Sequence, residues 1–212
     1  MENPLRSFLC TVKDWLIKYC DETPPIKKPT TPPYDDTIPV LPKLNERVRI
    51  SRYLHPCIRE PLETSLHECH SQGLMVYVFE SYRTSQRQQF LYDQGRTKPG
   101  RIVTNAKPFQ SWHNYGLAFD MVFDGDERDG IQWSWEGDYN TEKIDGDKRS
   151  DYERVGEIFV RHGFEWGAQW KSFKEMPHFQ KRFDLSLGEV QSIYDEGGLQ
   201  AVWKEITRRD IG

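Results

Sequence analysis

The stretch Ser-Trp-His-Asn-Tyr-Gly-Leu-Ala-Phe-Asp, residues 111–120, decides what fold and chemistry to expect of this chain. It holds a histidine, His113, seven residues before a carboxylate, Asp120, with Gly116 between them. That spacing is too long for one turn of helix. It predicts one ligand on a loop, a tight bend at the glycine, and a second ligand on the strand that the bend enters.

A second block, Glu-Met-Pro-His-Phe at residues 175–179, completes a candidate metal site. The histidines His113 and His178 and the carboxylate of Asp120 form a sufficient ligand set for one catalytic zinc, with a fourth position open for water. The proline disfavours helix at the residue before it, so Glu175 is expected on a turn leading into the strand of His178. A carboxylate there can take a proton from the attacking water and act as general base.

Amide hydrolysis also builds negative charge on the carbonyl oxygen, and a cation beside that oxygen lowers the barrier. Arg83 is the candidate for this catalytic role, because it follows the run Leu74–Glu80, which is predicted to be a buried strand. The alternative is an ordinary ion pair, which most arginines form.

Composition excludes several classes of protein. The 212 residues carry a net charge of −4, which does not indicate a nucleic-acid partner. The longest apolar run, Leu74–Phe79, is far shorter than the roughly 20 residues of a membrane span. Seven Trp, ten Tyr and eleven Phe indicate a compact domain with an aromatic-lined groove rather than a disordered chain. The sequence does not indicate the oligomeric state.

Cysteines and the N-terminal residues bear on the compartment. The four cysteines include no C-x-x-C pair, so they are interpreted as buried thiols rather than disulfides; they are Cys10, Cys20, Cys57 and Cys69. Leu5–Ile17 is interrupted by charges and is followed by no small-residue cleavage site, so no signal peptide is evident.

Three regions follow one another along the chain. Residues 1–22 show the apolar spacing of an amphipathic helix. Residues 23–45 hold seven prolines and predict an extended linker or strap. Residues 46–212 are expected to form the catalytic domain with a C-terminal helical extension. Within it, helices are predicted at 56–72, 85–94, 151–162 and, as two pieces split by Gly197-Gly198, at 186–206; strands are predicted at 74–80, 119–123 and 178–181. The mixed order predicts an α+β domain with a small antiparallel sheet flanked by helices.

At these motifs the chain resembles the zinc L-alanyl-D-glutamate endopeptidases of bacterial cell walls and phage endolysins, within the superfamily of the VanY and VanX D-Ala-D-Ala peptidases. The matching segments are 54–56, 81–84, Gln88, 91–97, 102–106, 111–120, 163–167, 170–173 and 175–180. The resemblance implies a fold shared with the Hedgehog signalling domain. It implies zinc bound by His113, Asp120 and His178, with Glu175 as general base and Arg83 as transition-state cation.

Substrate contacts are predicted beside these residues. Gln88, Ser111, Trp112, Tyr115 and Trp170 are the candidates, with core packing as the alternative for Tyr115. Residues 124–150 are expected to form one wall of the cleft.

The resulting hypothesis is a peptidoglycan hydrolase that cleaves the L-Ala–D-Glu bond of the stem peptide. One alternative is a D,D-carboxypeptidase or D-Ala-D-Ala dipeptidase on the same zinc site. The other is a zinc-stabilised wall-binding module without activity, which should lack the base or a ligand. The place of action is the cell wall, reached either by release from the cytoplasm as a phage lysin or by an unrecognised export route.

Overall fold

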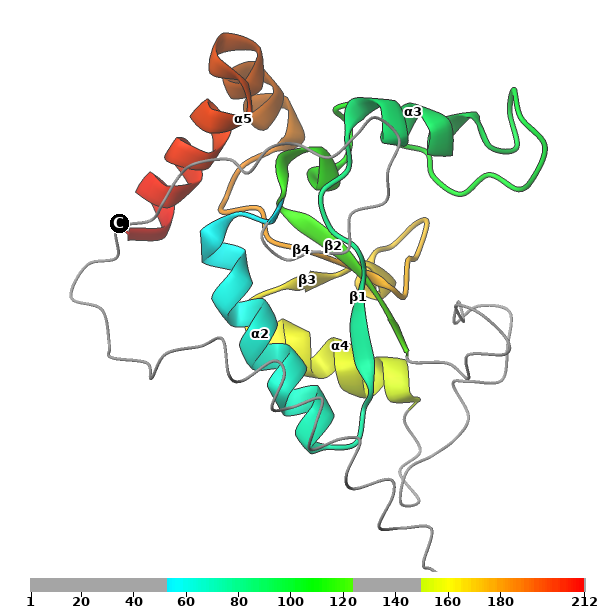
Figure 1. Ribbon diagram of the computed structural model, residues 1–212, viewed down its shortest axis with the longest axis vertical. Helices are drawn as coiled ribbons and strands as arrows, with labels where there is room; N and C mark the ends of the chain where they lie inside the picture. Colours follow the sequence, from blue (N-terminus) through cyan, green and yellow to red (C-terminus); the bar gives the residue numbers. More distant parts are fainter. Residues whose placement is uncertain (1–52, 124–149, 212) are drawn as a thin grey trace, which may run out of the picture. The chain divides into compact units, whose positions relative to one another are not determined.

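The computed structural model describes residues 53–123 and 150–211 (Figure 1). The predicted helix at 1–22, the linker at 23–45 and nearly all of the predicted cleft wall at 124–150 lie outside these residues, as do Cys10 and Cys20. Within the described part of the chain, no helix is both long and apolar enough to cross a membrane.

The strands form one antiparallel sheet in the order β1-β2-β4-β3. The strands are β1 (Val76–Glu80), β2 (Ala118–Phe123), β3 (Glu165–Trp166) and β4 (His178–Gln180). In the ladder between β2 and β4, Asp120 lies opposite His178 and Phe119 lies opposite Phe179. Because side chains alternate along a strand, the Asp120–His178 pair faces one side of the sheet and the two phenylalanines face the other.

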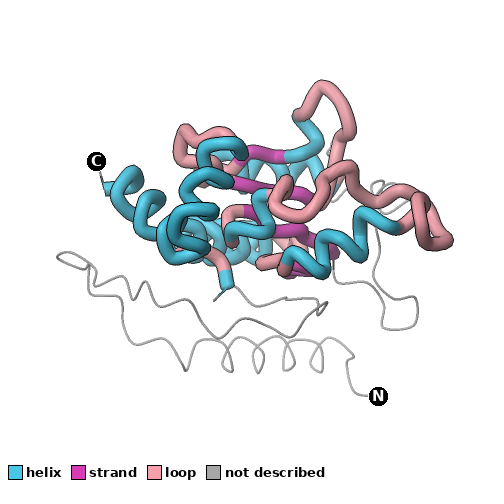
Figure 2. The backbone as a smooth tube through the Cα atoms, turned by 90° about the horizontal axis from the view of Figure 1, so that it is seen from above, coloured by secondary structure: helices cyan, strands magenta, loops and turns pink. Residues whose placement is uncertain are grey.

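Helices flank this sheet (Figures 1 and 2). They are α2 (Pro56–Ser71), α3 (Ser85–Asp93), α4 (Asp151–Arg161) and α5 (Leu187–Ile211), with short 3₁₀ helices η2 (Trp112–Tyr115) and η5 (Gly167–Gln169). Helices α2 and α4 contact each other; α2 also contacts β1, and α4 contacts β3. Helix α5 contacts η2, the element that carries His113.

An aromatic cluster forms the core between the sheet and α4. The ring of Phe179 lies 4.7 Å from that of Phe159 and 5.8 Å from that of Phe119. Phe164 packs edge-on against Phe119, with ring centroids 5.1 Å apart. Such ring pairs stabilise a fold by more than the area they bury. The cluster therefore holds β2 and β4 in register on one face of the sheet, and Asp120 and His178 lie on the other face.

Local sequence signals explain where the helices begin and end. The Ser150 hydroxyl accepts from the Glu153 amide and the Glu153 carboxylate accepts from the Ser150 amide, a capping box that starts α4. Helix α2 is followed by Gly73 at φ +77°, where the amide donates to the His70 carbonyl. Glycine adopts this left-handed conformation without steric cost, so the predicted stop is confirmed.

The predicted α+β class and its antiparallel sheet are confirmed, and the element boundaries differ by one or two residues for most elements. The first strand begins at Val76 instead of 74, because the Leu74 amide is used to close α2 on the Cys69 carbonyl. The C-terminal helix is interrupted at Gly197 and Gly198 as expected, but it continues to residue 211. Strand β3 and helix η2 were not predicted. Cys57 and Cys69 are buried free thiols, as expected.

Candidate metal centre

Three side chains converge on one point beside the sheet. The Nε2 of His113, the Nδ1 of His178 and the Oδ1 of Asp120 form a triangle with edges of 3.2, 3.2 and 3.3 Å. A tetrahedral ion with bonds of about 2.0–2.1 Å separates its ligand atoms by roughly 3.3–3.4 Å. The triangle therefore fits a small metal ion as it stands, and among the described residues these three form the group that could hold one.

Each of the three side chains is held by a partner on its other polar atom. His113 Nδ1 donates to the Ser81 carbonyl at 2.7 Å. In a neutral imidazole Nε2 is then unprotonated, and its lone pair faces the centre. His178 Nε2 lies 3.0 Å from Gln180 Oε1, which leaves Nδ1 facing the centre. Such outer partners fix the ring and the tautomer of a metal-binding histidine.

Asp120 is held by Arg83. Its Oδ2 accepts from Arg83 Nη2 at 2.9 Å, so Oδ1 remains for the centre. Arg83 also donates to the carboxylate of Glu80 at 2.7 and 3.0 Å, and Glu80 accepts from Arg87 at 2.9 Å. Gln88 Oε1 accepts from Arg83 Nη1 at 3.1 Å. All five residues are buried, so Arg83 is part of a buried ion-pair network rather than the surface pair considered from the sequence.

These contacts set the ionisation of the network. Burial alone would raise the pKa of Asp120, but His113, His178 and Arg83 hold it well below its ordinary value. Burial would likewise raise the pKa of Glu80, and the guanidinium groups of Arg83 and Arg87 lower it instead. Both carboxylates are therefore charged at neutral pH.

Glu175 lies beside the triangle. As predicted, it belongs to no helix or strand and precedes the turn into β4. Its Oε2 is 3.6 Å from His178 Nδ1, near enough to share a water molecule with the centre, but Glu175 does not belong to the converging group of possible ligands. Its side chain is 26% exposed, so the carboxylate is open to solvent on one side. Burial raises its pKa, and a bound cation would oppose that rise.

The predicted substrate contacts fall into two groups. Trp170 is partly exposed and its ring lies 5.0 Å from that of His178, so it borders the centre. Gln88 is fully buried and binds Arg83 and the Ala106 carbonyl, a position that fits holding Arg83 rather than meeting substrate. Tyr115 is also fully buried in the core.

Of the remaining two candidates, Trp112 lies in the same core cluster as Tyr115, 7% exposed. Because Tyr115 is fully buried in this cluster, it packs in the core, which was the alternative to a substrate contact. Ser111 precedes η2 and is 9% exposed. Only Trp170 among the five is positioned at the open side of the centre.

Comparison with known proteins identifies the family. A family model described as D-alanyl-D-alanine carboxypeptidase, of the M15 peptidases, matches residues 104–181. Peptidoglycan L-alanyl-D-glutamate endopeptidase CwlK of Bacillus subtilis (strain 168) is 40% identical over 128 residues, which are 60% of this chain and 72% of CwlK. This chain belongs to the M15 peptidase family. The resemblance inferred from the motifs is confirmed.

Two further M15-type matches are weaker. The L-alanyl-D-glutamate peptidase of Listeria phage A118 is 28% identical over 114 residues, which cover 52% of this chain and 31% of the phage protein. The crystal structure of Serratia marcescens L-Ala D-Glu endopeptidase ChiX aligns with 66% of this chain and 92% of its own, at 23% identity and a TM-score of 0.38.

Gly167 holds the general-base candidate of this M15 peptidase in place, although nothing in the sequence except its position in a matching segment pointed to this role. A Cβ at Gly167 would lie 2.6 Å from the Glu175 carbonyl oxygen and 3.2 Å from the Cβ atoms of Glu175 and His178. The Gly167 carbonyl accepts from the Glu175 amide at 3.3 Å. The backbone of Glu175 therefore approaches residue 167 too closely for any side chain.

Gly167→Ala is accordingly expected to lower kcat by roughly 10- to 100-fold, because a displacement near 1 Å can cost that much in rate. The matched control is Gly188→Ala on α5, where the nearest atom to the added Cβ lies 4.0 Å away. Kinetics on a soluble stem peptide would measure both variants. Equal activity of the two would show that the contact between Gly167 and Glu175 does not matter for the reaction.

The other positioning residues that sequence reasoning missed are Glu80, Asn114 and Gln180. Asn114 donates to the Arg83 carbonyl at 2.6 Å and fixes that residue's backbone. Gln180 carried a signal that could have been used, since residues two apart on a strand share a face and Gln180 follows His178 at that spacing. Glu80 carried none, because a strand-end glutamate is more often exposed than buried.

Proposed function

We propose that this protein is a zinc peptidase that hydrolyses the L-Ala–D-Glu bond in the stem peptide of peptidoglycan, with one zinc per chain. The observation that carries the proposal is the His113–Asp120–His178 triangle with Glu175 beside it. Two imidazoles and a carboxylate are the ligand types that zinc takes in hydrolytic sites. The 40% identity to CwlK supports the choice of bond.

In the proposed reaction, bound zinc supplies a Lewis acid that activates water and polarises the scissile carbonyl. Glu175 accepts the proton of the attacking water and later delivers it to the departing amine of D-Glu. The 3.6 Å between its carboxylate and His178 Nδ1 leaves it within reach of a water at the centre. Trp170, beside His178, forms one border of the site at which the peptide would lie.

Arg83 is proposed to act chiefly by positioning Asp120. Its guanidinium contacts two carboxylates and the Gln88 amide, which holds the Asp120 side chain with Oδ1 turned inward. Burial would lower the pKa of Arg83, but Glu80 and Asp120 raise it above its ordinary value, so Arg83 stays cationic. We propose that this charge also helps to stabilise the negative charge that builds on the carbonyl oxygen. The role of transition-state cation that the sequence predicts for Arg83 is thus proposed to be electrostatic stabilisation without direct contact with the substrate.

A second candidate is a D,D-carboxypeptidase on the same zinc, favoured by the description of the matching family model. The wall-binding module without activity is disfavoured, because Glu175 and all three proposed ligands are present and converge. The cell wall is the proposed place of action under each of these alternatives.

A digest of purified peptidoglycan tests the proposal. We expect new L-Ala carboxyl ends and free D-Glu amino ends by mass spectrometry, loss of both after treatment with a chelator, and recovery on adding zinc. Release of D-Ala alone would assign the enzyme to the carboxypeptidase branch. Cleavage that persists at full rate in the metal-free protein would contradict the zinc mechanism.

A further inference from the structure

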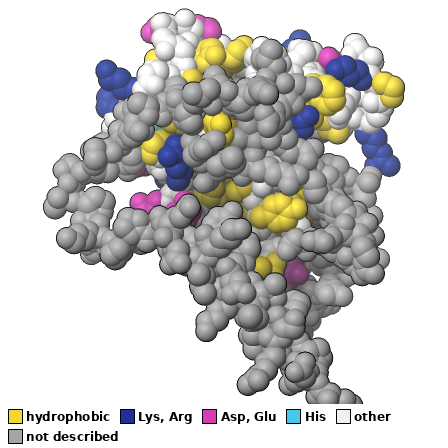
Figure 3. Space-filling model, in the orientation of Figure 1, with side chains coloured by type: hydrophobic (Ala, Val, Ile, Leu, Met, Phe, Trp, Pro, Cys, Tyr) yellow, Lys and Arg dark blue, Asp and Glu magenta, His cyan; other side chains and the backbone are white. Residues whose placement is uncertain are grey.

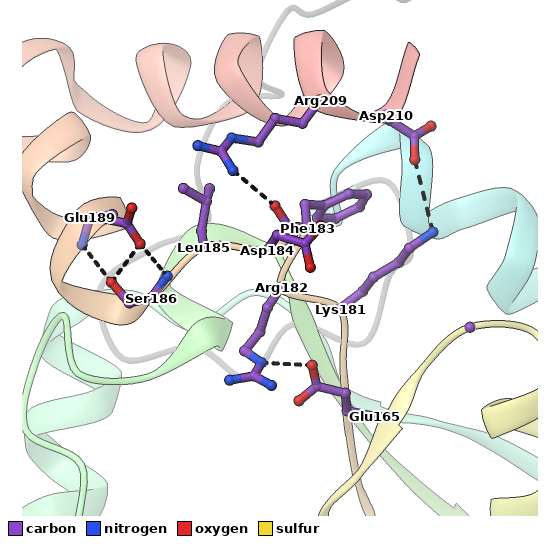
Figure 4. Close-up of a pocket in the computed structure, with 11 residues that line it drawn as sticks. Glu165, Lys181, Arg182, Phe183, Asp184, Leu185, Ser186, Glu189, Arg209 and Asp210 are labelled. Carbon is purple, nitrogen blue, oxygen red and sulfur yellow. Dashed lines mark hydrogen bonds and ion pairs between the residues drawn. The ribbon is translucent and has the colours of Figure 1, made fainter. Parts of the chain in front are cut away.

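A chain of polar contacts runs from His178 away from the metal triangle. His178 Nε2 lies 3.0 Å from Gln180 Oε1, and Gln180 Nε2 donates to Glu165 Oε2 at 3.1 Å. Arg182 Nε in turn donates to Glu165 Oε1 at 2.6 Å, the contact drawn in Figure 4. His178 and Gln180 are both buried, whereas Arg182 is half exposed and lines the cavity of Figure 4.

The sheet brings these residues together. Gln180 follows His178 by two positions on β4, so the two side chains share a face. Glu165 lies directly opposite Gln180 in the ladder between β3 and β4, and opposed residues of an antiparallel pair are in side-chain contact. Strand β3, only two residues long, thus supplies a carboxylate directly beside the Gln180 amide.

The ionised carboxylate of Glu165 determines which atom donates and which accepts in each hydrogen bond between Glu165, Gln180 and His178. An ionised carboxylate only accepts hydrogen bonds, so it binds the NH₂ end of the Gln180 amide. The amide oxygen is then turned to His178, where it can only accept, which requires the imidazole proton to be on Nε2. A neutral imidazole carries one proton, so Nδ1 is left as a lone pair facing His113 and Asp120.

We propose that Gln180 is a positioning residue that selects the metal-binding tautomer of His178, and that Glu165 sets the orientation of Gln180. The inference rests on the proposed metal site but not on the proposed substrate. Its readouts are metal affinity and the exchange rate of the His178 Nε2 proton, both measured without peptide. A failure to cleave peptidoglycan would therefore refute the proposed function and leave this inference standing.

The first test is Gln180→Ala, with zinc affinity measured by competition against a chromogenic chelator. Loss of an outer partner of a metal-binding histidine typically costs 10- to 100-fold in affinity, and we expect a loss in that range. Ring-nitrogen NMR of the zinc-bound protein should show the His178 Nε2 proton hydrogen-bonded and slow to exchange in the unmodified chain, and exchanging faster with solvent in the variant. Affinity within twofold of the unmodified protein, or an unchanged exchange rate of the Nε2 proton, would overturn the proposal.

A swap of the two side chains is the sharper test. Gln180→Glu alone puts two carboxylates in contact and should weaken zinc binding. In Glu165→Gln combined with Gln180→Glu, the carboxylate at position 180 still accepts from His178, and the amide at position 165 donates to it. The double variant should recover most of the affinity lost in the single variant. If the double variant binds zinc no more tightly than Gln180→Glu alone, the proposal that Glu165 sets the orientation of the side chain at position 180 is contradicted.

Lys181→Gln provides the matched control. Lys181 follows Gln180 directly, but its ammonium pairs with Asp210 at 3.9 Å and lies 4.9 Å from the centre of the Phe183 ring. Its zinc affinity is expected to equal that of the unmodified protein. An equal loss in this variant would mean that any change at the end of β4 disturbs the centre, which would also overturn a specific role for Gln180.

A separate observation concerns the loop after α3, residues 94–110, called here the basic arm. It contains Arg96, Lys98, Arg101 and Lys107 and no acidic residue, in a chain whose net charge is −4. All four side chains are exposed. Figure 3 shows dark blue Lys and Arg side chains beside yellow hydrophobic ones over the region where Figure 1 places α3 and this loop.

Two cations of the basic arm are held against aromatic rings, and one of them, Lys98, also pairs with Asp93 at 3.9 Å. The Arg96 guanidinium lies 4.0 Å from the centre of the Tyr92 ring, and the Lys98 ammonium lies 4.3 Å from that of Phe90. Cation–π contacts of this kind order a side chain and keep its charge. Ile102 is 49% exposed at the same loop, so apolar surface accompanies the charge.

The basic arm is anchored beside the metal centre. Gln88, which binds Arg83, donates to the Ala106 carbonyl at 2.7 Å, and the Phe109 amide donates to the side chain of Asn114 at 3.0 Å. A polymer chain bound at the centre would therefore lie near the anchored end of the basic arm, where Lys107 is exposed. We infer that the basic arm binds the carboxylates of stem peptides that neighbour the one being cleaved, an inference that rests on the proposed function.

The test neutralises three of the cations together, by Lys98→Gln, Arg101→Gln and Lys107→Gln. Co-sedimentation of zinc-free protein with peptidoglycan stripped of other anionic polymers should be salt-sensitive and weaken about tenfold in this variant. The rate on a short soluble stem peptide should stay within twofold. The assay scores binding to the polymer rather than cleavage, so its outcome does not depend on whether the proposed reaction is correct.

The control variant neutralises three exposed cations elsewhere, by Arg161→Gln, Lys204→Gln and Arg208→Gln, and should sediment like the unmodified protein. Peptidoglycan whose carboxyl groups have been amidated should lose the same binding that the arm variant loses. Unchanged binding of the arm variant, or full binding to the amidated polymer, would overturn the inference.

Discussion

Replacing Glu175 with glutamine is expected to lower kcat on a soluble stem peptide by roughly 10²–10⁴-fold, the usual contribution of a general base. The amide has nearly the same shape as the carboxylate but cannot take a proton from water. Zinc affinity should change little, because Glu175 does not belong to the converging group of His113, Asp120 and His178. Turnover and metal content of the same preparation measure both effects.

Glu196→Gln is the control for this substitution, since Glu196 is an exposed residue of α5. It removes the same charge from the chain and should leave kcat unaltered. Full activity of Glu175→Gln would mean that another group takes the proton. If Glu175→Gln also kept its full effect on cell walls while the purified protein cleaved nothing, the wall-binding module would become the better description.

Glu80→Gln is expected to destabilise the protein by about 3–5 kcal/mol, the usual cost of leaving a buried charge without its partner. Glu80 is 2% exposed and accepts from both Arg83 and Arg87, which are buried with it. A loss of that size is a large part of the stability of an ordinary domain. Chemical denaturation of the zinc-free protein gives the free energy of unfolding directly.

Glu205 offers a close control, because it also pairs with two arginines, Arg208 and Arg209, but at the surface of α5. Exposed ion pairs contribute little because water and salt screen them. Glu205→Gln should therefore cost far less than Glu80→Gln. Similar losses in the two variants would show that burial does not determine the strength of the Glu80 network.

The stability difference between the unmodified protein and Glu80→Gln is expected to depend on pH. The folded-state pKa of Glu80 lies below its ordinary value of 4.5, so its contribution to stability is present above that value and is lost as the pH falls through the lower, folded-state pKa. The gap in unfolding free energy between the unmodified protein and Glu80→Gln should thus be constant near neutral pH and narrow as the pH falls below 4.5. A gap that stays constant below pH 4.5 would contradict the lowered pKa.

The metal centre was largely predictable from the sequence because its parts sit in short blocks. His113, Gly116 and Asp120 are close in the chain, and the bend between them depends on a glycine, which the structure places at φ +69°. Glu175 and His178 share a turn and the start of a strand. Local spacing therefore carried most of the information, and the fold had only to bring the two blocks together.

The parts that could not be predicted depend on tertiary contacts. The pairing of Glu165 with Gln180 requires β3, which at two residues is too short for any periodic pattern. The sequence analysis assigned Trp112 to the substrate contacts and left Tyr115 open between the site and the core, and the structure places both in the core. They are three residues apart in η2, where such residues lie above one another, and both are directed into the core.

The antiparallel pairing of Asp120 with His178 has a consequence for how specificity can change in this family. The relative position of these two residues is set by the ladder between β2 and β4, not by the residues that connect the strands in sequence. Closing a longer connection costs little additional free energy. The part of the connection that lies between the end of β2 at Phe123 and the start of α4 at Asp151 can therefore change in length or sequence, whereas α4, β3 and Gly167, which follow it, must be kept. New substrate preferences could evolve in that part, or be selected from a library, around an unaltered reaction centre.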